Sequence, residues 1–374
     1  MMREVFVVSD NIVSPLGSTT AGNVDQLKKN ISGIRKQTDQ SISPDPFFAS
    51  LLGKGGEDRD DIFTPFEQLL LSSIDDALDK TSIDPADKKT IFIISSTKGN
   101  IGLLETQPLT EALEKRIALH HSARLIAGHY HAANEPLVVS HACISGLLAI
   151  ITAMRMLQSG QYDHAVIAGA DLISRFVLSG FQSFQAISAE PCRPFDADRN
   201  GISLGEGAAT VILSSNKNHS SEIRVCGGSV SNDANHISGP SRTGEELFQA
   251  MSKALTASGI TAKDIDFISA HGTATVYNDE MEAKAINLAG MQDVPVNSLK
   301  GYYGHTLGAA GLIESVISIR SLKENLLLPT LGFRKPGTNK PIRVSDQPQT
   351  GAFRHCLKTA SGFGGCNAAL VFSK

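Results

Sequence analysis

The stretch PLVVSHACISGLLAIITAMRMLQSG, residues 136–160, contains the features that decide the fold of this chain. A short run rich in β-branched residues is followed by a turn of small residues and then by a long apolar helix pattern. This order places Cys143 at the N-terminus of the predicted helix, where unpaired backbone N–H groups and the helix dipole favour a thiolate. Cys143 is the best nucleophile candidate in the chain, although a cysteine before an apolar helix is more often a small buried hydrophobic residue.

The same order of strand, small-residue turn and apolar helix occurs again at 294–322, VPVNSLKGYYGHTLGAAGLIESVISIRSL. Further helix patterns at 67–79 and 244–258 each lead into a short β-type run, TIFIIS and IDFISAHG respectively. Strands that alternate with helices predict parallel βαβ units and an α/β fold.

The repetition predicts two similar halves, 1–216 and 217–374. The polar stretch SSNKNHSS at 214–221 is the predicted exposed connection between them. A chain of 374 residues is long enough to bury a large core in two such units.

Composition excludes several classes of protein. A net charge of −4 and a hydrophobic fraction of 41% indicate neither a nucleic-acid surface nor a disordered chain. The N-terminal apolar run is too short for a signal peptide, and no window reaches the roughly 18 apolar residues of a membrane span. The five cysteines are scattered, which argues against a disulfide framework and a metal site. We therefore expect a cytoplasmic enzyme that binds no metal, no nucleic acid and no membrane.

Two glycine-rich segments supply possible partners for the thiol. His271 lies in AHGTAT, residues 270–275, and His305 ends SLKGYYGH, residues 298–305. Either histidine alone could be a core residue hydrogen-bonded to backbone. A thiol and two histidines in comparable turns together predict a catalytic triplet.

Six motifs, in this order, carry a resemblance to a known family: VVSDNIVSPLG (7–17), HACISG (141–146), PFDADRNGISLGEGAA (194–209), HGTATVYNDEMEA (271–283), SLKGYYGHTLGAAG (298–311) and SGFGGCNAALV (361–371). Across almost its whole length the chain resembles the elongating β-ketoacyl-acyl-carrier-protein synthases, type I/II condensing enzymes of the thiolase-like superfamily. The resemblance implies a thiolase-like fold, in which duplicated βαβ halves form a five-layered αβαβα core.

The resemblance also implies a chemistry. Cys143 is expected to hold an acyl group as a thioester, which the enolate formed by decarboxylation of a malonyl-carrier thioester then attacks. His271 and His305 are expected to hydrogen-bond the malonyl thioester carbonyl. Lys300 is expected to support the histidines, with Glu282 as its acidic partner, because a buried ammonium without a partner is costly.

Binding roles follow from the same resemblance. Thr273 and Thr275 match threonines that hydrogen-bond a phosphopantetheine arm, and their alternation puts both hydroxyls on one side of an extended segment. The substrates are expected to arrive on that arm of acyl carrier protein, without a cofactor bound by the enzyme itself.

The turn Gly362-Phe363-Gly364 is expected to complete the site. The backbone N–H groups of Cys143 and Phe363 would form an oxyanion hole, and the glycines allow the close backbone approach that this requires. Phe363 also matches an aromatic gate, and Phe181 matches a wall of the acyl pocket.

Three departures from the family pattern leave alternatives open. Lys98 stands where an apolar side chain normally lines the acyl pocket; either it reaches solvent, or the acyl chain is short, polar, aryl or conjugated. His141 could tune the thiolate if it faces the pocket. Cys366 is either a small packing residue or a second reactive thiol.

The expected function is the decarboxylating condensation that forms a β-ketoacyl-carrier protein, in fatty-acid or in polyene or polyketide synthesis. The alternatives are a catalytic subunit paired with a non-catalytic chain-length partner, and a non-catalytic scaffold of the same fold. The resemblance implies a dimer, either a homodimer or a heterodimer with a related subunit.

Overall fold

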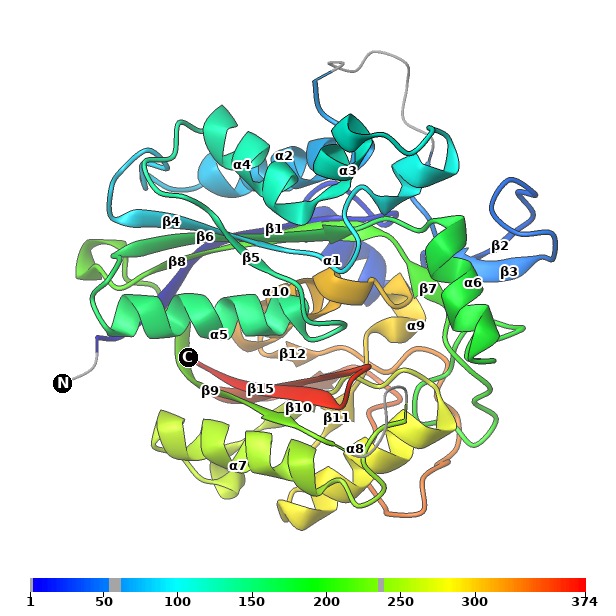
Figure 1. The fold of residues 1–374 in the computed structure, drawn as a ribbon. Coiled ribbons are helices and arrows are strands. Elements are labelled where there is room, and N and C mark those ends of the chain that lie inside the picture. The colour runs from blue at the N-terminus through cyan, green and yellow to red at the C-terminus, as the bar shows by residue number, and fades with distance from the viewer. Residues whose placement is uncertain (1–2, 54–61, 235–238) are drawn as a thin grey trace.

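The computed structural model of the protein describes residues 3–53, 62–234 and 239–374, which form five alternating layers of helices and strands (Figure 1). One β layer contains, in spatial order, β5 (Leu137–Val139), β4 (Thr90–Ser95), β6 (His164–Asp171), β8 (Gly207–Ser214) and β1 (Phe6–Val13). The other contains β9 (Arg224–Asn232), β15 (Cys366–Ser373), β14 (His355–Gly362), β10 (Phe267–Ser269) and β11 (Val296–Asn297). The two layers are continuous through the pair Phe6–Arg224. The expected αβαβα core is confirmed.

The middle layer consists of α5 (Ser145–Gln158) and α10 (Ala310–Glu324), which lie between the two β layers in Figure 1. Most residues of both helices are buried, as their place in the interior requires. The helices touch closely near their N-termini: a Cβ on Gly146 would lie 2.8 Å from the carbonyl oxygen of Gly308, and one on Gly311 would lie 2.5 Å from the nitrogen of Leu147. These glycines bring the turn before α5 next to the turn before α10.

The two outer layers are amphipathic helices that cover the remaining faces of the sheet (Figure 1). One is formed by α2 (Pro65–Leu78), α3 (Glu111–Ile117) and α4 (Leu119–His129), the other by α7 (Glu245–Ser258) and α8 (Val276–Leu288). In α7 the residues at helical spacing, Leu247, Ala250, Met251 and Ala254, are buried. The helices predicted at 67–79 and 244–258 are therefore confirmed.

Parallel pairing holds for only part of the sheet. It joins β4 to β5 and β6, and β10 to β11 and β14. These pairs confirm the predicted parallel units, whereas the central pairs β6–β8, β8–β1, β9–β15 and β14–β15 are antiparallel. A short turn such as 363–365, between β14 and β15, can connect only antiparallel neighbours.

Smaller elements complete the described fold: α1 (Thr20–Lys28), β2 (Arg35–Gln37), β3 (Phe47–Ser50), α6 (Arg175–Ser183), β7 (Leu204–Gly205), α9 (Lys300–Tyr303), β12 (Leu326–Leu327) and β13 (Gln349–Thr350). The predicted boundary between 216 and 217 lies in the connection from β8 to β9, and the division into two halves stays a prediction. Within the described residues, no helix is both long and apolar enough to span a membrane.

Candidate active site

The nucleophile candidate lies in a strained turn directly before α5. Ala142 has a left-handed backbone conformation with φ 46°, which is unusual for a residue other than glycine. Ser145 holds the turn, since its hydroxyl accepts the N–H of His141 at 2.8 Å and donates to the carbonyl of Ala142 at 2.6 Å. Cys143 is thereby placed at the start of α5, as the sequence predicts, and is 8% exposed.

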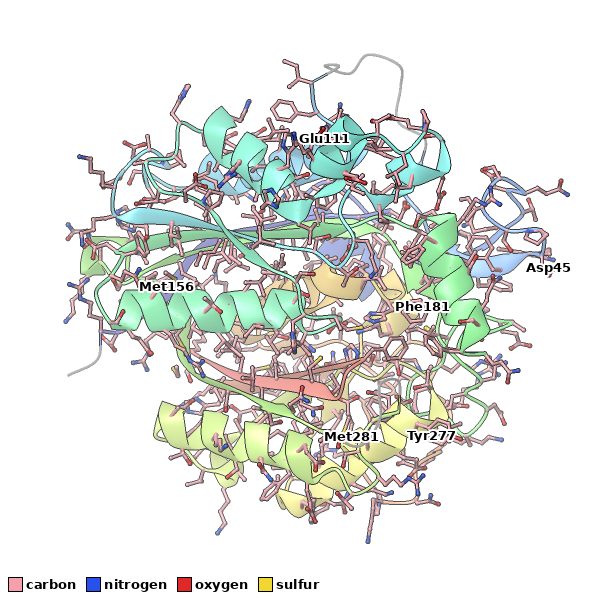
Figure 2. The ribbon with its side chains drawn as sticks, in the orientation of Figure 1. Asp45, Glu111, Met156, Phe181, Tyr277 and Met281 are labelled. Atoms are coloured by element: carbon pink, nitrogen blue, oxygen red, sulfur yellow. The ribbon has the colours of Figure 1, made fainter. Side chains whose placement is uncertain are left out.

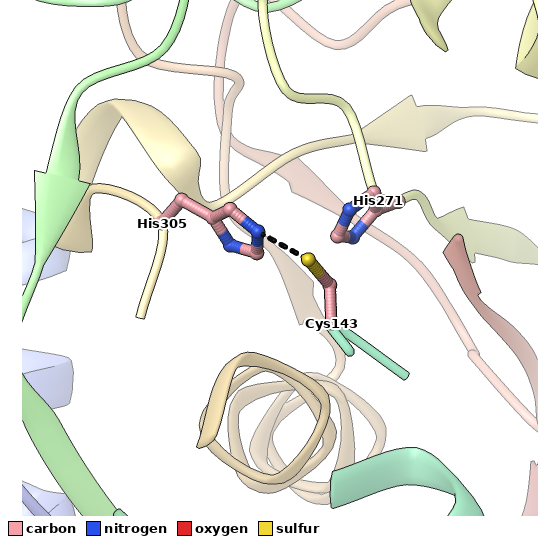
Figure 3. A group of neighbouring side chains, drawn as sticks. All are labelled: Cys143, His271 and His305. Carbon is pink, nitrogen blue, oxygen red and sulfur yellow. Dashed lines mark hydrogen bonds between the residues drawn. The ribbon is translucent and has the colours of Figure 1, made fainter. Parts of the chain in front are cut away.

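The two histidines lie on either side of this thiol (Figure 3). Nε2 of His305 is 2.9 Å from Sγ of Cys143, and the imidazole rings of His271 and His305 are 5.2 Å apart between centroids. His305 follows the one-turn helix α9 and precedes α10, whereas His271 follows β10. The predicted triplet is brought together from segments far apart in the sequence.

Burial controls the charge of these three groups. It raises the pKa of the Cys143 thiol to about 12. It also holds the pKa of His271 and of His305 well below the usual range, with the positive charge of Lys300 acting in the same direction. Burial thus disfavours the charged form of all three groups. It opposes the thiolate that the helix N-terminus is expected to favour, and that expectation stays a prediction.

The same three residues have the donor types of a metal centre. One ligand atom from each of Cys143, His271 and His305 lies within 4.8 Å of the others. However, the 2.9 Å separation of sulfur and nitrogen is that of a hydrogen bond. Two ligands of one tetrahedral zinc ion are about 3.6 Å apart. The geometry fits proton transfer between thiol and imidazole, and the absence of a metal stays a prediction.

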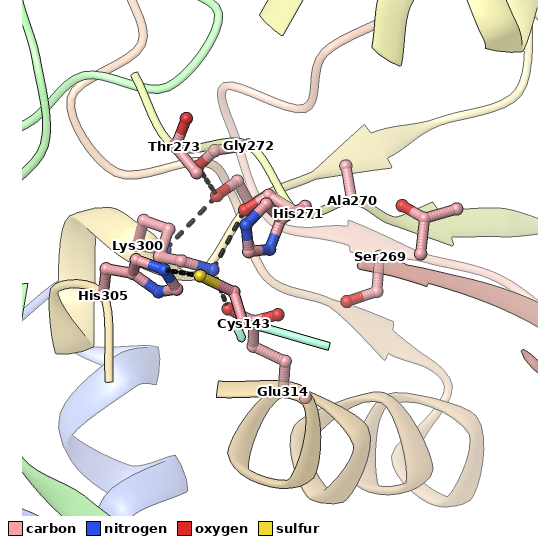
Figure 4. Close-up of polar contacts among 12 residues, drawn as sticks. Cys143, Ser269, Ala270, His271, Gly272, Thr273, Lys300, His305 and Glu314 are labelled. Atoms are coloured by element: carbon pink, nitrogen blue, oxygen red, sulfur yellow. Dashed lines mark hydrogen bonds and ion pairs between the residues drawn. The ribbon is translucent and has the colours of Figure 1, made fainter. Parts of the chain in front are cut away.

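Lys300 lies beneath the histidines and is fully buried. Its ammonium donates to the carbonyl oxygen of His271 at 3.0 Å and forms an ion pair with Glu314 on α10 (Figure 4). The expected pairing of Lys300 with Glu282 is wrong. Glu314 is the partner, because the packing of α10 between the sheet layers brings its carboxylate to the ammonium.

Glu282 acts on the backbone of the His271 turn instead. Its carboxylate accepts the N–H groups of His271 at 2.8 Å and Gly272 at 2.6 Å, and also the hydroxyl of Thr359 at 3.0 Å. Glu282 belongs to α8, which follows the turn directly. It supports the site by holding the histidine in place rather than by neutralising Lys300.

Four buried charged residues near the site were not singled out from the sequence. Glu314 and Lys358 form an ion pair at 2.8 Å. Asp279 accepts the backbone N–H of Thr273 at 3.0 Å, and Asp171 accepts the N–H groups of Lys98 at 3.2 Å and Gly308 at 2.7 Å. The sequence does indicate two of these four residues, because Glu314 and Lys358 are isolated charges within otherwise apolar stretches.

A cavity of about 780 Å³ leads to the triplet and is called the entrance cavity here; Arg242, His271, Thr273, Thr275, Tyr277 and His305 contribute to its lining. The hydroxyls of Thr273 and Thr275 lie 2.8 Å apart, as expected from their alternation. Tyr277 is 77% exposed at the start of α8, and Figure 2 shows it at the same end of the layered structure as Phe181. The two threonines are placed to hydrogen-bond an extended chain that enters from the surface.

The loop 362–364, between β14 and β15, approaches Cys143. The backbone N–H of Phe363 hydrogen-bonds the Cys143 sulfur, and a Cβ on Gly362 would lie 2.9 Å from the nitrogen of Cys143. Gly364 has φ 85°, which strongly favours glycine at this turn. The Phe363 ring lies 5.6 Å from that of Phe181, so the expected gate and pocket wall are in contact.

Behind this gate lies a second cavity of about 970 Å³, called the side cavity here; Lys98, Ile101, Leu104, Phe176 and Leu307 contribute to its lining. It shares Cys143, Phe181, Phe184 and Phe363 with the entrance cavity. The two cavities therefore meet at the thiol.

Lys98 is exposed at the outer end of the side cavity. Its ammonium is 5.5 Å from the centroid of the Phe176 ring, which is 57% exposed. A cation over an aromatic face is a favourable contact. The structure thus places Lys98 both in reach of solvent and in the wall of the cavity.

His141 and Cys366 are the other two residues that depart from the family pattern. His141 is exposed and lines neither cavity, so it does not face the pocket. Cys366 is 2% exposed, and its sulfur lies 3.4 Å from the carbonyl oxygen of Phe363. Burial raises its pKa to about 11, so this thiol is protonated near neutral pH and fills space beneath the gate.

Comparison with protein families identifies both parts of the chain. Residues 2–219 match the family model for the β-ketoacyl synthase N-terminal domain, and residues 223–334 match that for the C-terminal domain. A curated relative, 3-oxoacyl-[acyl-carrier-protein] synthase 2 of Rhizobium meliloti (strain 1021), is 30% identical, with 100% of this chain and 99% of the relative aligned.

Solved structures agree on the fold. The ishigamide ketosynthase/chain length factor superposes with a TM-score of 0.90 at 24% identity, covering 100% of both chains. The type II polyketide ketosynthase AntDE, solved with its acyl-carrier protein AntF and a bound hexaketide, superposes with a TM-score of 0.89 at 21% identity, covering 100% of this chain and 99% of the other.

Proposed function

The chain belongs to the β-ketoacyl synthase family, and we propose that it condenses an acyl group held on Cys143 with malonyl-carrier protein, releasing CO₂ and a β-ketoacyl-carrier protein. It is an acyltransferase. The observation that carries the proposal is the position of Cys143, His271 and His305 at the junction of two cavities. One cavity suits a carrier arm and the other an acyl chain.

In the first half-reaction, the acyl group moves from the carrier thiol to Cys143. The sulfur–carbonyl bond to Cys143 forms, the bond to the carrier sulfur breaks, and the thiol proton passes to the leaving carrier thiolate. His305, at 2.9 Å from Sγ, is placed to relay that proton. Because the pKa of His305 lies well below its usual range, the imidazole holds that proton only transiently and returns it to the leaving thiolate.

In the second half-reaction, malonyl-carrier protein occupies the entrance cavity. Its carboxylate leaves as CO₂, and the bond electrons form an enolate on the thioester oxygen. His271 and His305 can stabilise that oxygen with ring N–H groups. Lys300 holds the carbonyl oxygen of His271 and thereby fixes one of these two rings.

Condensation then joins the two substrates. The enolate carbon attacks the thioester on Cys143, and the backbone N–H groups of Cys143 and Phe363 receive the developing oxyanion. Collapse of this intermediate breaks the bond to sulfur, and the Cys143 thiolate takes up one proton from solvent. The ring of Phe363 must move for both substrates to be present, because it lies between the two cavities.

The partner of this reaction is acyl carrier protein, and we place a second subunit over the side cavity. Leu104, Leu137 and Phe176 are exposed apolar residues; Leu104 and Phe176 line this cavity, and Leu137 lies on the edge strand β5. The names of two similar structures, one with a carrier protein and one with a chain length factor, support carrier binding and a heterodimer. Either a related subunit or a second copy can cover this surface.

Mass spectrometry tests the proposal directly. Incubation with acyl-carrier protein should add one acyl mass on Cys143, and subsequent malonyl-carrier protein should remove it with release of CO₂. The variant Cys366→Ala is the matched control, because it removes a neighbouring buried thiol and should still be acylated. Acylation of the wild type without later condensation would favour a non-elongating transferase, and no acylation at all would favour a scaffold.

A further inference from the structure

Lys358 is a fully buried lysine in β14 to which the reaction described above assigns no part. Its ammonium donates to three backbone carbonyl oxygens: that of Thr359 at 2.6 Å, that of Ser269 at 3.1 Å and that of Ala270 at 3.3 Å. A carboxylate oxygen of Glu314 lies 2.8 Å away. The three protons of the ammonium are thus all used, and four oxygens surround the charge. This arrangement is called the oxygen cage here.

The cage belongs to the segment that ends in His271. Lys358 holds the carbonyls of Ser269 and Ala270, and Lys300 holds the carbonyl of His271 itself. Glu282 accepts the N–H groups of His271 and Gly272 from the other side. Two cations and one anion therefore fix consecutive peptide groups, and the imidazole can shift only if this network gives way.

Lys358 also balances charge beneath the imidazole. Glu314 bridges Lys300 and Lys358, and Glu282 supplies a second carboxylate, so that two positive and two negative groups are buried together. The positive charge of Lys358 is among the causes that hold the pKa of His271 low. Without it, the two carboxylates would face a single ammonium, and a cation on His271 would be favoured.

We propose that Lys358 is an internal cation of the active site, which positions His271 for malonyl decarboxylation and whose oxygen cage accepts a small free cation when the side chain is shortened. Four oxygens from carbonyl and carboxylate groups are the ligand set that alkali cations and ammonium ions share with a lysine ammonium. The part of Lys358 in decarboxylation rests on the proposed function, whereas cation binding by the oxygen cage does not depend on that function.

Two variants separate the charge from the shape. Lys358→Ala removes the ammonium and leaves space for an ion, whereas Lys358→Met removes the charge and keeps the space filled. Both are assayed in potassium chloride, in ammonium chloride and in tetramethylammonium chloride at equal ionic strength. The tetramethylammonium ion is too large for the cage and serves as the salt control.

Decarboxylation and acylation are measured separately, together with the melting temperature. In tetramethylammonium chloride both variants should lose about 10²-fold in decarboxylation. Acylation of Cys143 should fall much less. Potassium or ammonium should restore decarboxylation and raise the melting temperature of Lys358→Ala only, because binding to the folded state stabilises it. A purely structural lysine would impair both half-reactions together.

Three results would overturn the proposal. A decarboxylation rate of Lys358→Met equal to that of the wild type would show that the charge is unnecessary. Equal responses of Lys358→Ala to all three salts, or failure of that variant to fold in any of them, would show that no cation site exists. If the wild type decarboxylates no malonyl carrier, the proposed function fails, and the melting temperature of Lys358→Ala still decides the cation site.

Discussion

The turn before α5 and the turn before α10 have the same order of elements, but they differ in the charged residues that accompany them. In each, a residue with positive φ directly precedes the reactive side chain: Ala142 with φ 46° before Cys143, and Gly304 with φ 68° before His305. An apolar helix follows both turns, and the two helices pack side by side in the middle layer. The two turns thus supply comparable positions at one point of the core.

Charge distinguishes them. In α5 the one charged side chain is Arg155, in the last turn, whereas the second region contains the buried pair Lys300 and Glu314. Around Cys143, burial raises the pKa of the thiol, and the charges of Lys300 and Asp171 act on that pKa in opposite directions. A histidine that must stabilise an enolate needs a fixed position, which buried ion pairs provide. The same order of turn and helix can therefore present a nucleophilic thiol in one place and a fixed histidine in the other, where buried charged residues are added beside the second turn.

Removing the reactive group from the first turn should have the largest effect. Cys143→Ala should abolish acylation and condensation while the melting temperature stays close to that of the wild type, because the change removes the nucleophile and little volume. Intact-protein mass spectrometry and product analysis measure the two outcomes. Condensation retained by this variant would refute the assignment of roles to the two turns.

Removing the charge that distinguishes the second turn should cost stability. Glu314→Gln leaves Lys300 and Lys358 without their shared counter-charge, and loss of a buried partner costs about 3–5 kcal/mol. Urea unfolding measures the difference. Glu324→Gln, at the end of the same helix, breaks a partly exposed pair with Lys28 and should cost less than about 1 kcal/mol. Similar losses of stability in both variants would mean that the buried pair contributes no more than the partly exposed one.

Removing the reactive group from the second turn should separate the half-reactions. His305→Ala should lower decarboxylation about 10²–10³-fold, because a stabilising group at the enolate oxygen is lost. Acylation of Cys143 should fall less, since the thiol remains and its proton can pass to the leaving carrier thiolate without the relay. The acyl mass and CO₂ release are followed separately, with the exposed His120→Ala as control. Equal loss of both activities by His305→Ala would contradict the division of roles.

Pushing the two helices apart should disturb both turns at once. Gly311→Ala would place a Cβ 2.5 Å from the nitrogen of Leu147. Overpacking of this kind costs about 1–3 kcal/mol. Unfolding midpoints and the two half-reaction rates measure the effect. Gly128→Ala, where nothing lies within 4 Å of the new Cβ, should be neutral or slightly stabilising. If Gly311→Ala behaved like this control, the close helix contact would not be needed.

The smallest expected effect concerns selectivity at the outer end of the side cavity. A long saturated chain that leaves the Lys98 ammonium poorly solvated loses roughly 1–3 kcal/mol. Lys98→Ile should therefore raise acylation by an octanoyl carrier relative to a short or polyene carrier, by about tenfold. Lys98→Arg keeps the cation and should leave the ratio unchanged. An unchanged ratio in Lys98→Ile, or a wild type that prefers palmitoyl-length chains, would show that Lys98 only faces solvent.

Sequence alone predicts what depends on local order. The runs around 136–160 and 294–322 identify two strand–turn–helix units, because hydrophobic periodicity and small residues act over a few positions. The same reasoning selects Cys143, His271 and His305 as residues in comparable turns, and the family motifs add Lys300. The structure places all four together.

Only the tertiary structure decides which charges meet and which groups lose water. Glu282, expected beside Lys300, holds the backbone of the His271 turn, and Glu314 from α10 takes its place. Lys358 joins them from β14, far away in the sequence. Around Cys143, burial opposes the thiolate that the helix N-terminus favours. Ion pairing and desolvation depend on the packing of distant elements, whereas turns and helices depend on their neighbours in the chain.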